Sequence, residues 1–246
     1  FVLYGGLYQA MMEQAMAEAS RFREHDPKNP CQGNLMWSYN DCWGEIGWSI
    51  IDHYGRPKPS YYAVRRAYKP VKVIVRSREN DLVTRVVNDD IIAHDVEVTY
   101  GWIRVDGSAR EVKTRRLKIP PNSMAEIGKA NALDIRRPPV INGHPLDPKE
   151  WIYAATMTGP GIEDDQSTWL LVPCRELALA PSKLRIERKG DDLIVSCPTY
   201  CAGVHLPEDS GAKMSDDYFD LLPGVAHVVR VLTPADHYDI EVAMPR

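Results

Sequence analysis

The sequence predicts a mixed fold, in which a helix–strand–helix unit is followed by two antiparallel β-sandwiches. Two stretches with apolar residues at helical spacing, at residues 7–22 and 59–67, flank a short apolar run at residues 35–37. From residue 71 onward, apolar and polar residues alternate in short runs that are separated by turn residues. No helical pattern lies between these later runs, which is typical of antiparallel sandwiches.

The first helix is predicted from an apolar stripe over residues 7–22, with charged residues on the other faces. It should end before Pro27, because proline and the residue before it disfavour helical backbone. The stripe includes Met11, Met12 and Met16. We expect these flexible apolar side chains to pack against a sheet.

Residues 35–37 read Leu-Met-Trp and follow a glycine, which predicts a strand buried on both faces. The second helix should begin at Pro59 and Ser60, where the serine hydroxyl can cap backbone amides, and should end before Pro70. A parallel strand buried on both faces needs neighbouring strands. We expect those strands to belong to an upstream, N-terminal part of the same polypeptide.

Alternating runs predict the strands of a first sandwich, with a hairpin turn at Asp106 and Gly107. These runs are residues 71–76, 96–102, 112–119, 151–157 and 169–172. Residues 131–149 are rich in proline, glycine and asparagine and predict a long surface loop.

A second and smaller set of strands follows a boundary at residues 181–182, with a turn at Gly190. Its runs are residues 184–186, 193–197, 228–231 and 238–242. The sequence therefore predicts three units, at residues 1–68, 69–180 and 181–246.

Composition excludes several classes of function. The 30 basic and 34 acidic residues are interspersed and no basic block is present, which argues against nucleic acid as a partner. No apolar run approaches the ~20 residues that a membrane span needs. The 5 cysteines and 7 histidines lack the spacing of metal ligands, so we predict no cofactor and no metal site. No Asn-x-Ser/Thr site supports a glycosylating secretory route, which leaves the cytoplasm or a bacterial periplasm.

Aromatic rings stand beside amide and carboxylate groups directly after the predicted strand. Trp37, Asn40, Asp41 and Trp43 lie within seven residues of one another. The C–H faces of a sugar pack on aromatic rings, while its hydroxyls need planar hydrogen-bond partners. This mixture therefore favours a carbohydrate as the substrate.

Two motifs carry a resemblance to a known family. Residues 37–43 read Trp-Ser-Tyr-Asn-Asp-Cys-Trp and residues 52–56 read Asp-His-Tyr-Gly-Arg, and together they resemble the last barrel strand of glycoside hydrolase family 2, in its β-mannosidase branch. Residues 215–224, Ser-Asp-Asp-Tyr-Phe-Asp-Leu-Leu-Pro-Gly, resemble the final sandwich of the same enzymes. The resemblance implies the C-terminal piece of a (β/α)8 barrel, followed by two immunoglobulin-like β-sandwiches.

The resemblance also implies a reaction, the retaining hydrolysis of a terminal β-D-mannose. Such enzymes use two carboxyl groups about 5–5.5 Å apart, one as acid/base and one as nucleophile. In this family the acid/base follows an Asn-Glu pair on an earlier strand, and the nucleophilic glutamate lies on the seventh strand. Neither motif precedes the first helix here. We therefore expect both catalytic residues upstream, so no catalytic residue is predicted in this chain, which alone should be inactive.

What the resemblance assigns to this chain is substrate binding. Trp37 would stack on the sugar next to the cleaved bond, Trp43 would shape the wall of the subsite, and Asp41 would accept sugar hydroxyls or orient a base. Each has a structural alternative. Trp37 could be a core residue, Trp43 could serve packing alone, Asp41 could form an ion pair with an arginine of a neighbouring loop, and Asn40 could cap the loop.

Residues after the aromatic motif are interpreted as structural. Gly55 marks a turn, and Asp52 with Arg56 is expected to form an ion pair across it. Gly44 stands where β-mannosidases commonly carry proline, and Tyr39 where leucine is usual. Rival interpretations are therefore an exo-β-glucosaminidase or β-galactosidase of the same family, a non-catalytic carbohydrate-binding or structural module, and a sandwich pair that only mediates assembly.

Overall fold

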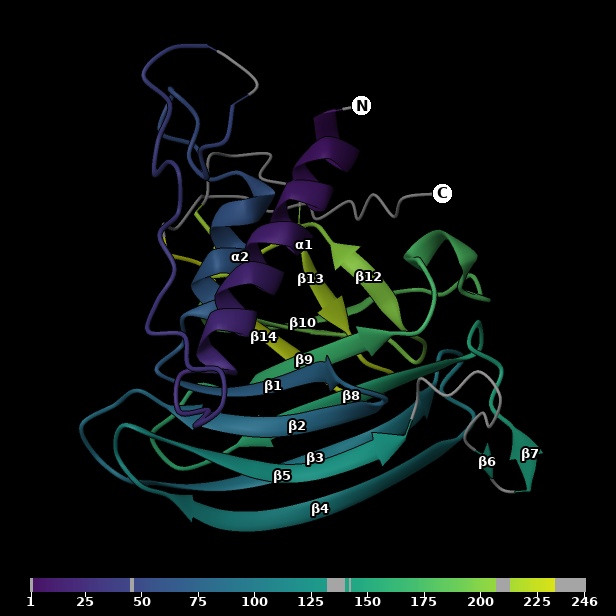
Figure 1. The fold of residues 1–246 in the computed structure, drawn as a ribbon. Coiled ribbons are helices and arrows are strands. Elements are labelled where there is room, and N and C mark those ends of the chain that lie inside the picture. The colour runs from purple at the N-terminus through teal and green to yellow at the C-terminus, as the bar shows by residue number, and fades with distance from the viewer. Residues whose placement is uncertain (1, 45–46, 132–139, 142, 207–212, 233–246) are drawn as a thin grey trace.

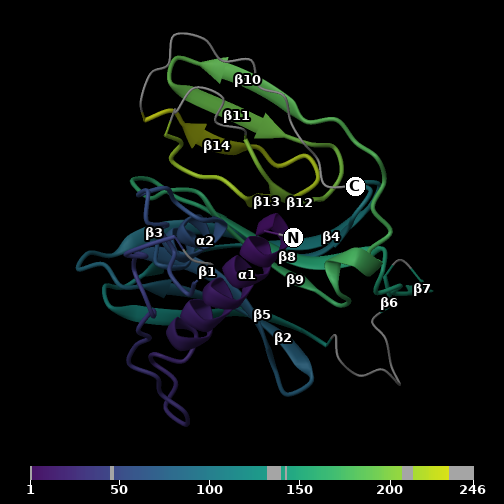
Figure 2. The same cartoon turned by 90° about the horizontal axis from the view of Figure 1, so that it is seen from above.

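The computed structural model describes residues 2–44, 47–131, 140–141, 143–206 and 213–232. Two helices lie side by side against a stack of antiparallel sheets, and a smaller group of sheets follows (Figure 1). Figure 2 shows the molecule from above, with the smaller group of sheets to one side of the first stack. Helix α1 crosses in front of the first stack. The described chain is thus mostly antiparallel β-sheet with few helices, which agrees with the sandwich part of the prediction. The barrel piece stays a prediction.

Both helices form where the sequence predicts them. Helix α1 spans Val2–Arg21 and ends before Pro27. Helix α2 spans Pro59–Ala67, with proline in its first turn, where a missing N–H costs nothing. The predicted cap by Ser60 is wrong. Lys58 occupies the N-cap position without a side-chain bond to the helix, and the buried Ser60 hydroxyl has no hydrogen-bond partner.

The prediction that the methionines of α1 pack on a sheet is wrong. Met11, Met12 and Met16 are all exposed. The buried face of the helix carries Ala10 and Ala17, at 6% and 0% exposed, beside charged residues that include Arg21. A Cβ atom built on Gly6, one turn earlier on that face, would lie only 3.1 Å from the ring of Pro59. The close approach of α2 therefore requires a glycine or another very small residue at position 6. The long methionine side chains lie on the exposed face of α1.

The prediction of a buried strand at residues 35–37 is also wrong for this chain. These residues join no sheet among those described, and Leu35 is 97% exposed. The physical reason is that a strand buried on both faces needs a neighbouring strand on each side. None of the described strands pairs with this segment.

The first sandwich stacks two antiparallel sheets. One sheet has the order β1 (Val71–Arg78), β2 (Asp81–Asn88) and β5 (Ser123–Asn131). The other has the order β4 (Arg110–Ile119), β3 (His94–Arg104), β8 (Trp151–Thr158) and β9 (Asp165–Leu170). Apolar side chains from both sheets form one core between them. All five strand predictions for this region fall on these elements, and the turn at Asp106 and Gly107 joins β3 to β4.

Strands β2 and β5 come from segments without a strand prediction. Strand β2 is buried on both faces, because Leu82 and Val86 face the sandwich core while Val83 and Val87 face Phe22 after α1. The helix pair therefore covers the outer face of this sheet, as Figure 1 shows. The predicted loop at 131–149 contains the two short strands β6 (Val140–Ile141) and β7 (His144–Pro145), and residues 132–139 and 142 lie outside the described residues.

The C-terminal part contains two small sheets, which follow a short 3-10 helix at Cys174–Glu176. One is made of β10 (Arg185–Lys189), β11 (Asp192–Ser196) and β14 (His227–Arg230), and the other of β12 (Cys201–Val204) and β13 (Phe219–Leu221). A core lies between them, and a third cluster around Tyr200 and Ile152 joins this part to the first sandwich. The strands predicted at 184–186, 193–197 and 228–231 are confirmed, while 238–242 lies outside the described residues. The division into three units stays a prediction.

Buried charged groups fix the helix pair on the first sandwich. Arg21 donates hydrogen bonds to the carbonyl oxygens of Ala67, Lys69 and Pro70, at 2.6, 2.7 and 3.1 Å, and pairs with Asp89 at 2.8 Å. These carbonyls belong to the end of α2 and to the link into β1. One guanidinium therefore holds the whole connection.

A second contact joins α1 to both sheets. The fully buried ammonium of Lys72 on β1 lies 3.1 Å from Asp165 on β9 and 3.4 Å from Glu18 on α1. Asp165 also accepts the backbone N–H of Val73 at 3.0 Å. Burying these charges is tolerable only because each has its partner. Within the described residues, no helix is long and apolar enough to span a lipid bilayer.

Candidate functional site

The segment between the two helices holds all four residues predicted to bind substrate. It leaves the end of α1, runs away from the sheets and returns at the start of α2 (Figure 1). Because the two helices are fixed on the sandwich, both ends of the segment are fixed too. We name residues 33–44 and 47–58 the aromatic segment.

The indole rings of the aromatic segment are exposed. Trp37 is 81% exposed and Trp43 is 67% exposed. Tyr39, Trp48 and Tyr54 are exposed as well. The core alternative for Trp37 therefore does not hold within this chain. The peptide bond between Trp37 and Ser38 is cis.

Backbone pairing gives the aromatic segment its shape. The N–H of Asp41 donates to the carbonyl oxygen of Ile51 at 3.0 Å, and the N–H of Ile51 donates to Tyr39 at 3.2 Å. Asn40 forms a parallel bridge with Ile51, and its side-chain amide lies 3.5 Å from the carbonyl oxygen of Asp41. The bridge places Asn40 and Asp41 on an ordered part of the segment.

A buried ion pair braces this pairing. The ammonium of Lys58 lies 2.7 Å from Asp41 Oδ2 and donates to Ser49 Oγ at 2.8 Å. Hydrogen bonds from Lys58 and Ser49 hold the pKa of the buried Asp41 carboxyl below its usual range. Asp41 thus forms its ion pair with a lysine of its own chain, where the structural alternative named an arginine of another loop. Sequence reasoning missed Lys58, since a lysine between two prolines carries no signal for a contact 17 residues away.

The predicted ion pair between Asp52 and Arg56 is confirmed. Arg56 Nε lies 2.9 Å from Asp52 Oδ2, and the other carboxylate oxygen accepts the backbone N–H groups of Tyr54 and Arg56. Gly55 has a φ of 77°, which a glycine adopts readily. The Arg56 guanidinium also lies over the ring of Tyr54. This turn is a structural brace, as its sequence suggested.

The carboxylates of the segment do not form a catalytic pair in the part described. Asp41 and Asp52 are each held by a cation, and Glu45 lies outside the described residues. A general acid needs a raised pKa, whereas the pKa of Asp41 is lowered by Lys58 and Ser49. What the segment offers is therefore flat apolar surface beside an amide. Among the described residues no cluster of histidine, cysteine, aspartate or glutamate could hold a metal ion.

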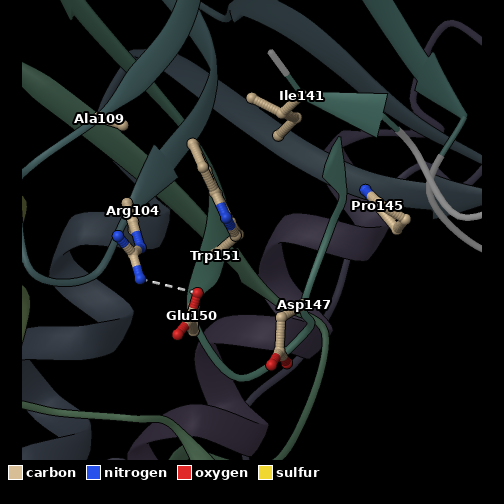
Figure 3. Close-up of a pocket in the computed structure, with 7 residues that line it drawn as sticks. All are labelled: Arg104, Ala109, Ile141, Pro145, Asp147, Glu150 and Trp151. Atoms are coloured by element: carbon tan, nitrogen blue, oxygen red, sulfur yellow. Dashed lines mark hydrogen bonds and ion pairs between the residues drawn. The ribbon is translucent and has the colours of Figure 1, made fainter. Parts of the chain in front are cut away.

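Two hollows among the described residues bear on the site, and the smaller of them borders the aromatic segment at Gly33 and Asn34. The larger, of about 270 Å³, is lined by residues that include Trp151 and Asp147, and Arg104 pairs there with Glu150 at 2.9 Å (Figure 3). The smaller, of about 140 Å³, lies at the end of α1 beside Arg21. Neither is lined by any of the four predicted residues. Those residues form an open surface in this chain.

Comparison with known proteins finds β-mannosidases similar to this chain. No family model matches the sequence. The chain is 44% identical over 237 residues to β-mannosidase B of Aspergillus fumigatus, a match that covers 87% of this chain and 27% of that protein. It is 26% identical over 233 residues to β-mannosidase B of Aspergillus niger, covering 85% of this chain and 26% of that protein. The chain is thus similar to β-mannosidases, which agrees with the resemblance that its motifs carry to glycoside hydrolase family 2.

The chain spans about a quarter of the length of the curated relatives it matches. Its fold is that of solved structures. β-D-Mannosidase from Dictyoglomus thermophilum matches 97% of the chain with a TM-score of 0.81 at 23% identity, over 29% of that protein. Exo-chitosanase CsxA from Amycolatopsis orientalis matches 94% with a TM-score of 0.65 at 15% identity, over 31% of its length. The first match covers helices and sheets alike.

Proposed function

We propose that this chain is part of a retaining exo-β-glycosidase that removes terminal β-D-mannose residues. In this proposal residues 1–68 complete a (β/α)8 barrel, and residues 69–180 and 181–246 are two immunoglobulin-like sandwiches behind it. The observation that carries the proposal is the 44% identity to a β-mannosidase over 87% of the chain. The exposed aromatic segment supports it, since its rings are available to a sugar or to further barrel strands.

The catalytic carboxyl groups belong, in this proposal, to the remainder of the longer polypeptide. Retaining hydrolysis needs a nucleophile and an acid/base about 5–5.5 Å apart. Asp41 and Asp52 are engaged by Lys58 and Arg56 and are ill suited to either role. The contribution of this chain is substrate positioning, and the chain alone would not hydrolyse glycosides.

The positioning residues are Trp37, Asn40, Asp41 and Trp43. The exposed face of Trp37 would stack on the C–H face of the sugar, and Trp43 would form a second wall. The Asn40 amide would bind sugar hydroxyls. The Asp41 carboxylate, already bonded through Oδ2 to Lys58, would use its remaining lone pairs for a hydroxyl or would hold the segment in shape.

The test uses the full-length polypeptide that carries these 246 residues. Its kcat/KM should be highest on an aryl β-mannoside when compared with the aryl β-galactoside and β-glucosaminide. Trp37→Ala should lower kcat/KM on the mannoside about ten- to a hundredfold, the range that one apolar contact in a pocket supplies. Trp48→Ala is the matched control, because that ring is equally exposed but has no assigned contact to the sugar. Its kcat/KM should stay within about threefold of the parent value, which is below that range.

Other outcomes would favour the rival interpretations. Faster turnover of the β-glucosaminide or β-galactoside would reassign the sugar within the same family. Sugar binding without hydrolysis of any of the three would indicate a non-catalytic carbohydrate-binding module. Equal losses in Trp37→Ala and Trp48→Ala would remove the assigned role of Trp37.

A further inference from the structure

Two cysteines lie in contact inside the C-terminal part of the chain. Cys197 follows the end of β11 and Cys201 begins β12. Their sulfur atoms are 3.2 Å apart, and the residues are 2% and 8% exposed. Both thiols are reduced. No other two cysteine sulfurs are in contact within the described part of the chain.

Polar groups surround the sulfur of Cys197. The Cys197 thiol donates to the hydroxyl oxygen of Ser182 at 3.1 Å, lies 3.6 Å from the hydroxyl of Thr199, and accepts the thiol hydrogen of Cys201. Burial opposes a charge on this sulfur, but hydrogen bonds with Ser182, Thr199 and Cys201 outweigh the effect of burial. The pKa of Cys197 therefore lies below its ordinary value. Burial and the neighbouring sulfur raise the pKa of Cys201 to about 12. Cys197 is thus the sulfur that more readily loses its proton, and Cys201 stays protonated beside it.

We propose that Cys197 and Cys201 form a redox-active dithiol, which a small peroxide converts to an intramolecular disulfide. The geometry that carries this is the direct contact of two thiols four residues apart, with the hydroxyl of Ser182 in place to accept the proton of Cys197. The contact also distinguishes the pair from Cys31 and Cys42, which lie on the aromatic segment and the loop before it.

The reaction runs in two steps. The Cys197 thiolate attacks one oxygen of hydrogen peroxide, the O–O bond breaks, and the displaced hydroxide takes up a proton to leave as water; Cys197 is then a sulfenic acid. The sulfur of Cys201 attacks the sulfenic sulfur and loses its proton. The S–O bond breaks and a second water leaves. Two thiols are oxidised by two electrons and one peroxide is reduced to two waters.

The disulfide would tether a loop that holds the C-terminal sheets on the first sandwich. Within this loop the N–H of Tyr200 donates to the carbonyl oxygen of Val105 at 2.7 Å, and its hydroxyl donates to Asp220 at 2.7 Å. The carbonyl oxygen of Cys197 accepts the N–H of Gly224 at 2.8 Å. Oxidation would close a ring around Tyr200 and limit the freedom of this loop in the unfolded chain.

Peptide mapping of the full-length polypeptide tests the proposal. Trypsin cleaves after Lys189 and Lys213 and at no site between them, so both cysteines fall in one peptide, residues 190–213. After brief treatment with hydrogen peroxide and alkylation in denaturant, this peptide should lose the mass of two hydrogens and carry no alkyl group. A reducing agent should restore two alkylated cysteines.

The chain supplies its own matched control. Cys31 and Cys42 also share one tryptic peptide, residues 29–65, because trypsin does not cleave before Pro57 or Pro59, but their sulfurs are not in contact. That peptide should stay alkylated at both positions under the same dose. Cys201→Ser should convert the product at Cys197 from a disulfide to a trappable sulfenic acid, and Cys174→Ser should leave the disulfide unchanged. Loss of hydrogens from 29–65 while 190–213 remains fully alkylated would overturn the proposal. The native peptide map decides this even if a variant fails to fold.

Discussion

Tryptophans of the sandwich and of the aromatic segment have opposite surroundings. On β3, Trp102 is 6% exposed and meets Tyr153 edge-on at 5.1 Å between ring centroids. In the aromatic segment Trp37, Trp43 and Trp48 are all exposed. The same residue type thus completes a core in one region and forms open surface in the other. The difference indicates that the sandwich satisfies its apolar residues internally, while the segment presents its rings outward.

Polar contacts determine the shape of the exposed aromatic segment. The exposed segment is braced by buried or well-formed ion pairs, Asp41 with Lys58 and Asp52 with Arg56. Its shape is therefore set by hydrogen bonds and charge, with little help from apolar packing. Such a segment can hold rings in fixed positions without burying them, which is what a binding surface requires.

Removing the core ring should give the largest effect on stability. Trp102→Ala should lower the free energy of unfolding by about 3–5 kcal/mol, through lost burial and the cavity that remains. Urea unfolding followed by circular dichroism measures this loss. A loss under about 1 kcal/mol would mean that the sandwich core is far looser than its burial indicates, and the contrast between the two regions would break down.

The buried ion pair behind the helices should come next. Asp165→Ala should cost about 3 kcal/mol, because Lys72 remains buried with one carboxylate partner fewer and the N–H of Val73 loses its acceptor. Glu163→Ala is the control, since its exposed carboxylate pairs with Arg65 and Lys69 only at 3.8 and 3.6 Å and should cost at most about 1 kcal/mol. Equal costs for the two variants in urea unfolding would contradict the role given to the buried pair.

The brace at Asp41 should be visible as a pH dependence. Lys58 and Ser49 lower the pKa of Asp41 in the folded state, so its stabilisation is fully present above the unfolded value of about 3.9 and is lost as the pH falls through the folded pKa. Asp41→Asn should therefore be less stable than the parent at neutral pH, and the two should converge below about pH 4. Thermal unfolding across this range measures the difference. A constant difference into strong acid would argue against the ion pair.

Exposed rings should matter least to stability. Trp37→Ala and Trp43→Ala should each change the free energy of unfolding by less than about 0.5 kcal/mol, as is usual for surface positions. The measurement is the same urea titration that is used for Trp102→Ala. A loss of several kcal/mol at Trp37 would show that the full-length polypeptide buries this ring, and would sharpen its assignment to an interface within the barrel.

Alternation made the sandwich predictable. Val71, Val73 and Val75 face the core between the sheets, while Lys72 and Ile74, which alternate with them, are buried on the helix side, where Lys72 pairs with Glu18 and Ile74 packs with Phe22. Strand β2 lacked this signal because Phe22 after α1 covers its outer face, so both faces are apolar. Strand β5 escaped prediction because its small and polar residues, such as Gly128, carry little strand preference.

Helix α1 and the aromatic segment show why the remainder could not be predicted. Periodicity located α1, but the choice of buried face depended on the close approach of Pro59 to Gly6, which no local pattern encodes. For the segment, residues 35–37 have the composition of a buried strand and are exposed instead. The ion pair between Asp52 and Arg56 was predictable because its partners are four residues apart, whereas the partner of Asp41 lies 17 residues away.

The hydrogen bonds of Arg21 affect how much entropy is lost when a ligand binds to the aromatic segment. Its guanidinium joins carbonyl oxygens on both sides of residue 68, so the link between helices and sandwich cannot swivel as a flexible linker would. The aromatic segment therefore loses its orientational freedom when the chain folds, before anything binds to it. A ligand or a neighbouring part of the polypeptide that docks on Trp37 meets a surface already oriented, and little entropy remains to be lost at that step.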